Sequence, residues 1–307
     1  MDITSIEKQG NVTESYLKII GTNGNFVVLN TIRRLLHEYI PIYSFSNIKF
    51  INNTSVYNND QLRLRIESMP IINFPNSEDT IDRLMKIIFE SNSELEQTDN
   101  EQLYMNCDVF NNNDTILNVT TDMCKYYHGG QQINNIYPMN ILICQLKKGQ
   151  HLKFSCNSKL YIALNSDLWT PICKCYYNIN DDKSFMFYCE SRGQIDEINL
   201  IIRACKLMIM IIKHIATIIE THVFESNEDT IFFQGCGHTI CNFLNDAIQD
   251  HPNVKQAGYK QEHQLIINTY INIVTDGTVT INKIISDIIT DRTALLNSII
   301  TKLRELS

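Results

Sequence analysis

An order of elements that occurs twice is the feature of this sequence that most constrains its fold. Apolar spacing predicts a strand, a short helix ending near a proline, further strands and a long helix in each copy. The first copy has them at residues 12–20, 26–40, 42–51, 174–178, 184–190 and 196–221. The second copy has them at residues 230–233, 239–249, 263–275 and 281–306. Such a duplication predicts that the two halves pair around a pseudo-twofold axis within one chain.

Residues 51–175 interrupt the first copy. Short apolar runs between Asn-rich loops favour β-structure there, with a helix at 78–90. We also expect a hairpin at 141–154 with its turn at 147–150. The predicted domains are therefore 1–50 with 176–222, the β-rich insertion 51–175, and 223–307.

Composition and charge narrow the class of protein. A chain of 307 residues with 44% hydrophobic residues can bury a full core without disulfides or metal ions. Its net charge of -8 argues against a primary nucleic-acid binder, which needs a basic face. The ten cysteines form no CxxC pair, and without an N-terminal secretory signal they are expected to be reduced and mostly buried. The apolar run 198–219 contains four basic side chains, so we expect a helix of a soluble core.

Motifs that would carry catalysis are absent from the sequence. There is no phosphate-binding loop, zinc-protease helix, nucleophile elbow or dinucleotide fingerprint. Three groups could offer a nucleophile or metal ligands, and for each we favour core thiols because the partner residues are missing. They are Cys236 with His238 and Cys241, Cys173 with Cys175, and Cys124 with His128. We expect no catalytic residue, no metal and no cofactor.

Two adjacent arginines lie in the otherwise apolar first helix. Arg33 and Arg34 could form an ordinary solvated face. Arginine is also the preferred cation of protein interfaces, because its planar fork pairs with carboxylates. Adjacent helical positions point about 100° apart, so one arginine could serve an intramolecular pair and the other a partner.

Several motifs of the first part together resemble a known family. They are Phe26–Leu36 with Tyr39-Ile40-Pro41, Arg63–Ile66 with Met69-Pro70-Ile71, Val119–Asp122, Ile141–Gln150 with Trp169-Thr170-Pro171, and Phe187–Gly193. In this order they resemble the alpha-type assembly subunits of multisubunit RNA polymerases. That family comprises bacterial alpha, the archaeal D-type protein and the third-largest subunit of polymerase II. In that family, residues 63–66 would be a strand before a proline turn.

The tail resembles the smaller partner of that subunit, the archaeal L-type protein and its eukaryotic equivalents. The matching motifs are Gly237–Asn242, Asp250–Val254, Ala257–Lys260, His263 and Thr275-Asp276-Gly277. The chain departs from the family at three places. Residues 72–106 lack the cysteine cluster of the D-type insertion, Asn245 replaces a basic residue, and Gln264 replaces a proline.

The resemblance implies an α+β fold in which two alpha-type dimerisation units, fused in one chain, form a pseudo-twofold pair. The first unit is interrupted by the β-rich insertion. It also implies a non-catalytic assembly subunit of a large-DNA-virus DNA-directed RNA polymerase, on which the two large catalytic subunits and smaller subunits dock. DNA and RNA would be met only through the complex, with no membrane contact. No self-dimer is needed, because the halves pair within the chain.

The resemblance also implies interface residues and a location. The expected subunit-interface residues are Asn30, Arg33, Arg34, His238, Thr239, Asn242, Gly258, Tyr259 and His263. The host-cell cytoplasm is the expected location, with the virion as a second candidate. The main alternative is a free-standing scaffold or regulator that keeps the fold, and a more distant one is a thiol-dependent enzyme around Cys236.

Overall fold

The computed structural model describes residues 1–10, 15–72, 102–164, 166–220, 228–234, 237–263 and 266–306. The predicted mixture of helices and sheets is confirmed, and the described strand pairs are antiparallel. The helix expected at 78–90 lies outside the described residues. None of the helices in the described ranges is both long and apolar enough to span a membrane.

The first sheet joins an N-terminal hairpin to two strands that lie far along the sequence, β10 and β11. Its order is β1-β2-β11-β10. These strands are β1 (Asp2–Gly10), β2 (Ser15–Thr22), β10 (Ile172–Ile179) and β11 (Phe185–Ser191). Helix α1 (Phe26–Glu38) packs against β10, and helix α4 (Glu197–Glu220) packs against β2 and β11. Residues on both sides of the insertion therefore build one sheet.

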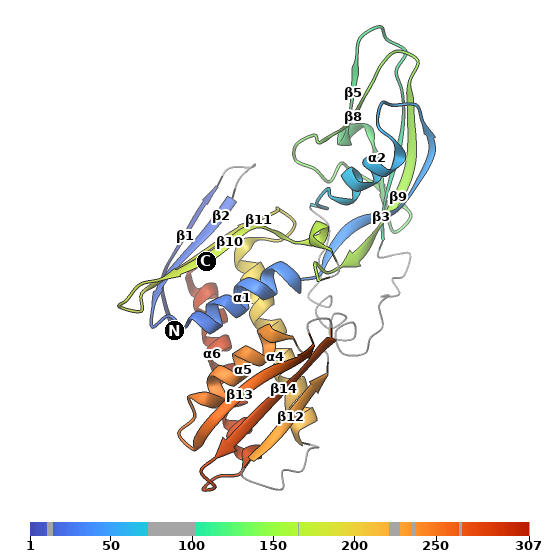
Figure 1. Cartoon of the computed structure of the whole chain (residues 1–307). Helices are drawn as coiled ribbons and strands as arrows, with labels where there is room; N and C mark the ends of the chain where they lie inside the picture. Colours follow the sequence, from blue (N-terminus) through green and yellow to red (C-terminus); the bar gives the residue numbers. More distant parts are fainter. Residues whose placement is uncertain are drawn as a thin grey trace.

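The C-terminal sheet has the order β12-β14-β13 and carries its own pair of helices. The elements are β12 (Glu228–Gln234), α5 (His238–Gln249), β13 (Val254–His263), β14 (Ile266–Thr275) and α6 (Ile281–Leu306). Helix α5 packs on β13 and β14, and α6 packs on α5. In Figure 1 the helices α1, α4, α5 and α6 lie between this sheet and the first one.

The chain between α1 and β10 builds a separate β-rich part that projects from the helices (Figure 1). Its sheets have the orders β3-β9-β4-β6-β7 and β5-β8. The elements are β3 (Ile42–Asn53), α2 (Asn59–Glu67), β4 (Leu103–Phe110), β5 (Leu117–Thr120), β6 (Lys125–His128), β7 (Gln131–Ile133), β8 (Leu142–Leu146) and β9 (His151–Tyr161). Short 3-10 turns lie at Thr121–Met123 and Asp167–Trp169.

Two hydrophobic clusters follow this division. One is shared by α1, α4, α5, α6, the first sheet and the C-terminal sheet, so apolar side chains of both sheets and all four helices form a single core. Within it α1 packs against α5, and α4 packs against α6. The other cluster draws its buried side chains from the range 43–160 and fills the projecting part. The projecting part thus has a core of its own.

Helix α1 begins and ends where local chemistry predicts. The side chain of Asn25 accepts hydrogen bonds from the backbone N–H groups of Val27 and Val28, which caps the first turn. The helix ends at Glu38, shortly before Pro41, whose ring cannot continue it. Its buried apolar residues recur on one side. They are Val27, Val28, Leu29, Ile32, Leu35 and Leu36.

The two long helices follow the predicted pattern with one exception. On α4, residues 199, 213 and 217 are exposed and Arg203 and Lys206 are half-buried, which confirms a polar stripe. On α6, the expected apolar face is buried or half-buried from Ile281 to Leu303. Leu306, expected on that face, is 44% exposed because the helix has passed the edge of the core.

Three local predictions are wrong. Residues 141–154 are not a hairpin, because β8 pairs with β5 whereas β9 pairs with β3 and β4. Residues 63–66, expected as a strand, belong to helix α2, which Asn58 starts with a reciprocal capping box to Gln61. The sequence predicts two strands within 263–275. They run instead over 254–263 and 266–275, so the expected range holds only one of them.

The cysteines of the described residues are free thiols, and most are buried as predicted. Cys173 is exposed and Cys175 half-buried. Burial raises the pKa of Cys144 and of Cys241 to about 11, which leaves both thiols uncharged at neutral pH. Cys144 and Cys241 are therefore buried core residues, while Cys236, the candidate nucleophile, lies outside the described residues.

A close approach in the first sheet gives a stability prediction. A Cβ atom on Gly21 would lie 2.3 Å from the backbone oxygen of Asp2 and 2.4 Å from the ring of Phe185. We expect Gly21→Ala to lower the free energy of unfolding by about 1–3 kcal/mol, as for overpacked sites. Gly258→Ala is the matched control, since a Cβ there meets no atom within 4 Å. Urea denaturation of both variants checks this, and equal stabilities would contradict it.

Candidate subunit interface

The outward face of α1 carries the two arginines that the sequence singles out. Arg33 donates from Nε and Nη2 to the Oδ1 atom of Asn30, at 3.1 and 2.9 Å. Both side chains come from one helix, three positions apart, so they share a face. Among the residues that the structure describes, no carboxylate lies within salt-bridge distance of Arg33. Its guanidinium therefore keeps its full charge available to a partner.

The surroundings of Arg34 differ from those of Arg33. Its Nη2 atom lies 3.0 Å from a carboxylate oxygen of Glu38, one turn further along the helix. The two side chains are 39% and 31% exposed, so the ion pair contributes only about 0–1 kcal/mol to the stability of the fold. Its Nε atom is buried and has no hydrogen-bond partner within the described part of the chain. Arg34 is thus held weakly and retains an unused donor.

His37 lies on the same helix as these arginines. Burial, and then the charge of Arg33, hold the pKa of His37 below its ordinary value of 6.5. Glu38 and Asp167 oppose this shift through their negative charges. A protonated His37 would add a further cation to a half-buried site that already holds Arg33, so the neutral imidazole is favoured.

The start of α5 lies against strand β13, and α5 also packs against α1. The ring of His238 stands edge-on to the ring of Tyr259, with centroids 5.8 Å apart. Burial, and then Cys241, raise the pKa of Tyr259, and the charge of Arg34 acts in the opposite direction. Two predicted interface residues, His238 of α5 and Tyr259 of β13, therefore lie in contact.

The other predicted residues do not join this cluster as exposed groups. Thr239 is buried and Asn242 half-buried in α5. Gly258 is exposed and points away from Tyr259, because neighbouring residues of a strand face opposite sides of the sheet. His263 is exposed at the end of β13, opposite Ile266. The nine residues thus do not form one continuous surface.

A polar junction that sequence reasoning missed joins α1, α5 and α6. Asp246 receives a hydrogen bond from Asn25 Nδ2 at 3.2 Å and an ion pair from Arg292 at 2.8 Å, on the same carboxylate oxygen. The guanidinium of Arg292 also lies over the ring of Phe243, 5.3 Å from its centroid. The capping rule could have found Asn25 in the sequence. The partnership of Asp246 with Arg292 could not be found, because it needs the packing of α5 on α6.

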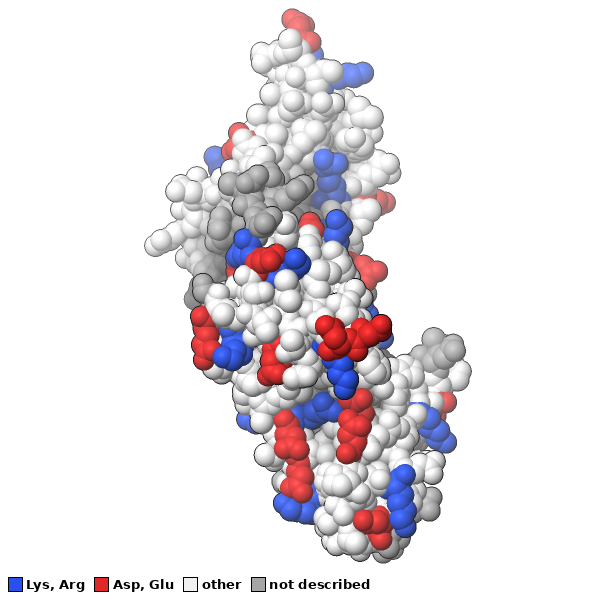
Figure 2. All heavy atoms as spheres, turned by 90° about the vertical axis from the view of Figure 1, so that its left-hand side faces the viewer, with Lys and Arg blue, Asp and Glu red and all other residues white. Residues whose placement is uncertain are grey.

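Charge on the molecular surface is mixed on the face that Figure 2 shows. Acidic and basic side chains alternate there over the lower part, while the upper part is largely uncharged. Within the described residues no group of three or more His, Cys, Asp or Glu side chains is placed to hold a metal ion.

Comparison with known proteins adds two similarities. Residues 228–302 match the family model described as the RNA polymerase Rpb3/Rpb11 dimerisation domain. The chain is also 21% identical, over 306 residues, to the protein named "Putative DNA directed RNA polymerase subunit R470" of Acanthamoeba polyphaga mimivirus. That alignment covers 89% of this chain and 86% of the mimivirus protein. The matched model spans the strands and helices of the C-terminal sheet.

The junction at Asp246 gives a second stability prediction. Replacing Asp246 with Ala leaves Arg292, whose side chain is 12% exposed, without its carboxylate. We expect the free energy of unfolding to fall by ~2–4 kcal/mol, somewhat below the cost of breaking a fully buried pair. Asp287→Ala, which removes the exposed pair with Lys283, should cost only ~0–1 kcal/mol. Chemical denaturation of both variants measures the difference, and a similar loss in both would contradict the role of the junction.

His37 gives a prediction about pH. Because its pKa is lower in the folded chain, the unfolded chain binds more protons as the pH falls below about 6.5, and stability declines there. His37→Gln should make stability less dependent on pH in that range. NMR titration of the imidazole should give a pKa below 6.5 that rises in Arg33→Gln, because a positive neighbour has been removed. A pKa at or above 6.5 would refute this.

Proposed function

We propose that this chain is a non-catalytic assembly subunit of a viral DNA-directed RNA polymerase. The observation that carries the proposal is the match of residues 228–302 to the Rpb3/Rpb11 dimerisation domain. The alignment with the mimivirus protein over nearly the whole of both chains supports it, since that protein is named as a polymerase subunit. The proposed role is to hold the two large catalytic subunits and smaller subunits together.

We further propose that the two halves take the places of two paired subunits. Phe26 and His238 are the first residues of α1 and α5, so Arg34 and Asp246 are the ninth residues of those helices. The capping residue of α1 contacts Asp246, and the charge of Arg34 acts on Tyr259, whose ring contacts His238. The start of α1 thus lies at the ninth residue of α5. We propose that the start of α5 lies in the same way beside Arg34, which would make the two helices a pseudo-twofold pair.

The two ninth positions differ in chemistry, which supports two different docking faces. Arg34 lies at the surface in a weak pair, whereas Asp246 is neutralised by Arg292 in a half-buried junction. Arg33 adds a second cation on the α1 side, and its equivalent on α5 is the buried Asn245. A basic face on one half and an uncharged face on the other would let two large subunits be told apart. We therefore propose Arg33 and Arg34 as contacts of one large subunit.

We also propose domain boundaries for the chain and a location where the protein acts. We propose dimerisation units at 1–50 with 176–222 and at 223–307, around an insertion at 51–175 that binds no metal. The hydrophobic cluster of the projecting part supports an insertion with its own core, although its residues begin at Tyr43 and its first strand β3 at Ile42, before residue 51. We propose the host-cell cytoplasm, and the virion as a second location, as the sites of action.

The free-standing scaffold remains the rival hypothesis, and copurification with two very large chains in fixed ratio would exclude it.

Replacing both arginines tests the docking face. Arg33→Ala with Arg34→Ala should weaken assembly with the large subunits by ~2–5 kcal/mol if an arginine is desolvated against a partner carboxylate. If both arginines are rim contacts, the loss of binding free energy should be only ~0–1 kcal/mol and should disappear at high salt. Assembly is measured by size-exclusion chromatography and titration of the purified subunits.

The control is Arg63→Ala, which removes an exposed arginine paired with Asp60 on α2. It should leave assembly unchanged. Circular dichroism first shows that each variant folds. Assembly that is unaffected at low and high salt by the double replacement would remove Arg33 and Arg34 from the interface.

A further inference from the structure

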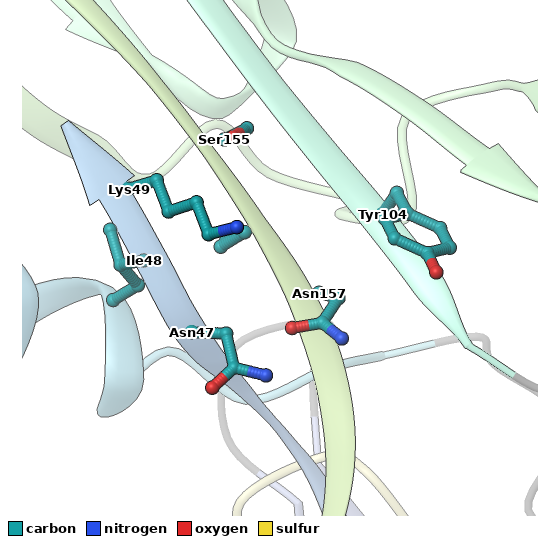
Figure 3. A pocket seen from close by; sticks show the side chains of 7 residues that line it. Asn47, Ile48, Lys49, Tyr104, Ser155 and Asn157 are labelled. Atoms are coloured by element: carbon teal, nitrogen blue, oxygen red, sulfur yellow. The ribbon is translucent and has the colours of Figure 1, made fainter. Parts of the chain in front are cut away.

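The outer face of the five-stranded sheet in the projecting part is hollowed. One hollow of about 500 Å³ is lined from β3, β9 and β4, including Lys49, Tyr104 and Asn157. Figure 3 shows these side chains on the three neighbouring strands. A second hollow of about 510 Å³ shares Ser155 with the first and is lined by Ile51, Met123 and Lys125 among others. The shared residue makes them neighbours on one surface, which we call the outer sheet face.

Two lysines lie at the ends of one row across this face. Lys49 is paired with Ser155 across β3 and β9, Ser155 with Asn106 across β9 and β4, and Asn106 with Lys125 across β4 and β6. Paired residues of neighbouring strands lie on the same side of a sheet. Three strand spacings of about 4.8 Å place the two lysine backbones ~14 Å apart. Serine and asparagine, both uncharged, fill the row between them.

The lysines of this row lack counter-charges. No described carboxylate is within salt-bridge distance of Lys49 or Lys125. The nearby Asp108 is taken by Lys153 at 2.6 Å and by His151 at 2.7 Å. These two contacts, Lys153 first, lower the pKa of Asp108, which keeps it ionised and paired. In a chain of net charge -8, this face is locally positive.

The same face has an unused acceptor and exposed apolar groups. Asn157 donates from Nδ2 to Gln102 at 2.7 Å, but its Oδ1 atom is buried and receives no hydrogen bond from the described residues. A buried acceptor without a donor costs free energy, so an incoming N–H group would be favoured. Ile51 is 66% exposed and Met123 37% exposed at the second hollow. Both would gain from being covered.

We propose that the outer sheet face binds an extended acidic segment of another protein. Two carboxylates four residues apart in an extended chain are separated by about 13 Å, which matches the row from Lys49 to Lys125. An apolar side chain between them would cover Ile51 or Met123, and a backbone N–H of the segment would reach Asn157. The two unpaired lysines, the ionised Asp108 and the exposed apolar groups suit a protein better than a phosphate backbone, which needs many cations. The inference does not depend on the polymerase role.

The test uses the full-length chain and a fluorescein-labelled peptide of about ten residues, with two glutamates four positions apart and leucines between them. Fluorescence anisotropy should show saturable binding that weakens as salt increases. Lys49→Glu with Lys125→Glu should lower the affinity at least about tenfold. A peptide with glutamine in place of both glutamates should bind at least about tenfold more weakly.

Matched controls distinguish binding at the outer sheet face from a general effect of the net charge of the protein. Lys147→Glu with Lys255→Glu makes the same change in net charge at exposed positions outside the outer sheet face, and should leave the affinity within about twofold. Thermal unfolding followed by circular dichroism verifies that both double variants fold. No binding up to about 1 mM peptide, or equal loss in both double variants, overturns the proposal. Tighter binding of a thymidine oligonucleotide that also depends on Lys49 and Lys125 would overturn it in favour of nucleic acid.

Discussion

The contact of α1 with α5 inside one apolar core is the constraint on which the rest of the structure depends. Each apolar side chain that α1 buries contributes about 1.5–3 kcal/mol, whereas its exposed pair of Arg34 with Glu38 contributes about 0–1 kcal/mol. Apolar burial therefore holds the two halves together. The polar groups fix how they meet, since Asp246 accepts from both Asn25 and Arg292 and would be left poorly satisfied in another register.

Separate cores let the chain present separate surfaces. The helices are fixed between two sheets by the shared cluster, while the projecting part fills its interior with its own cluster. Changes on the outer sheet face need not disturb the α1–α5 contact, because no buried side chain belongs to both clusters. A single chain can thus offer a basic helix face, a C-terminal sheet and a projecting sheet to different partners.

The candidate interface shows how similar residues come to differ. Arg33 and Arg34 are neighbours in the sequence, yet one is hydrogen-bonded to a neutral amide and the other to a carboxylate. Their equivalents in α5 are a buried asparagine and a half-buried aspartate. Under the proposed correspondence of α1 with α5, the second helix therefore turns inward the positions that the first turns outward. Arg292 on α6 makes this possible by neutralising Asp246.

Sequence alone determined the elements whose signals are local. Apolar spacing, Asn25 and Pro41 are sufficient to place α1, and the apolar face of α6 predicts its bounds, because each signal acts within one or two turns. The helix at 59–67 also has a local signal, the capping pair Asn58 and Gln61, which the strand expected from the family resemblance left unused. Pairing of β8 and β9 with other strands and the bond of Asp246 to Arg292 were decided by tertiary structure. Each joins residues that are distant in the sequence. The positive outer sheet face belongs to the same class, since its row exists only once four strands are in register.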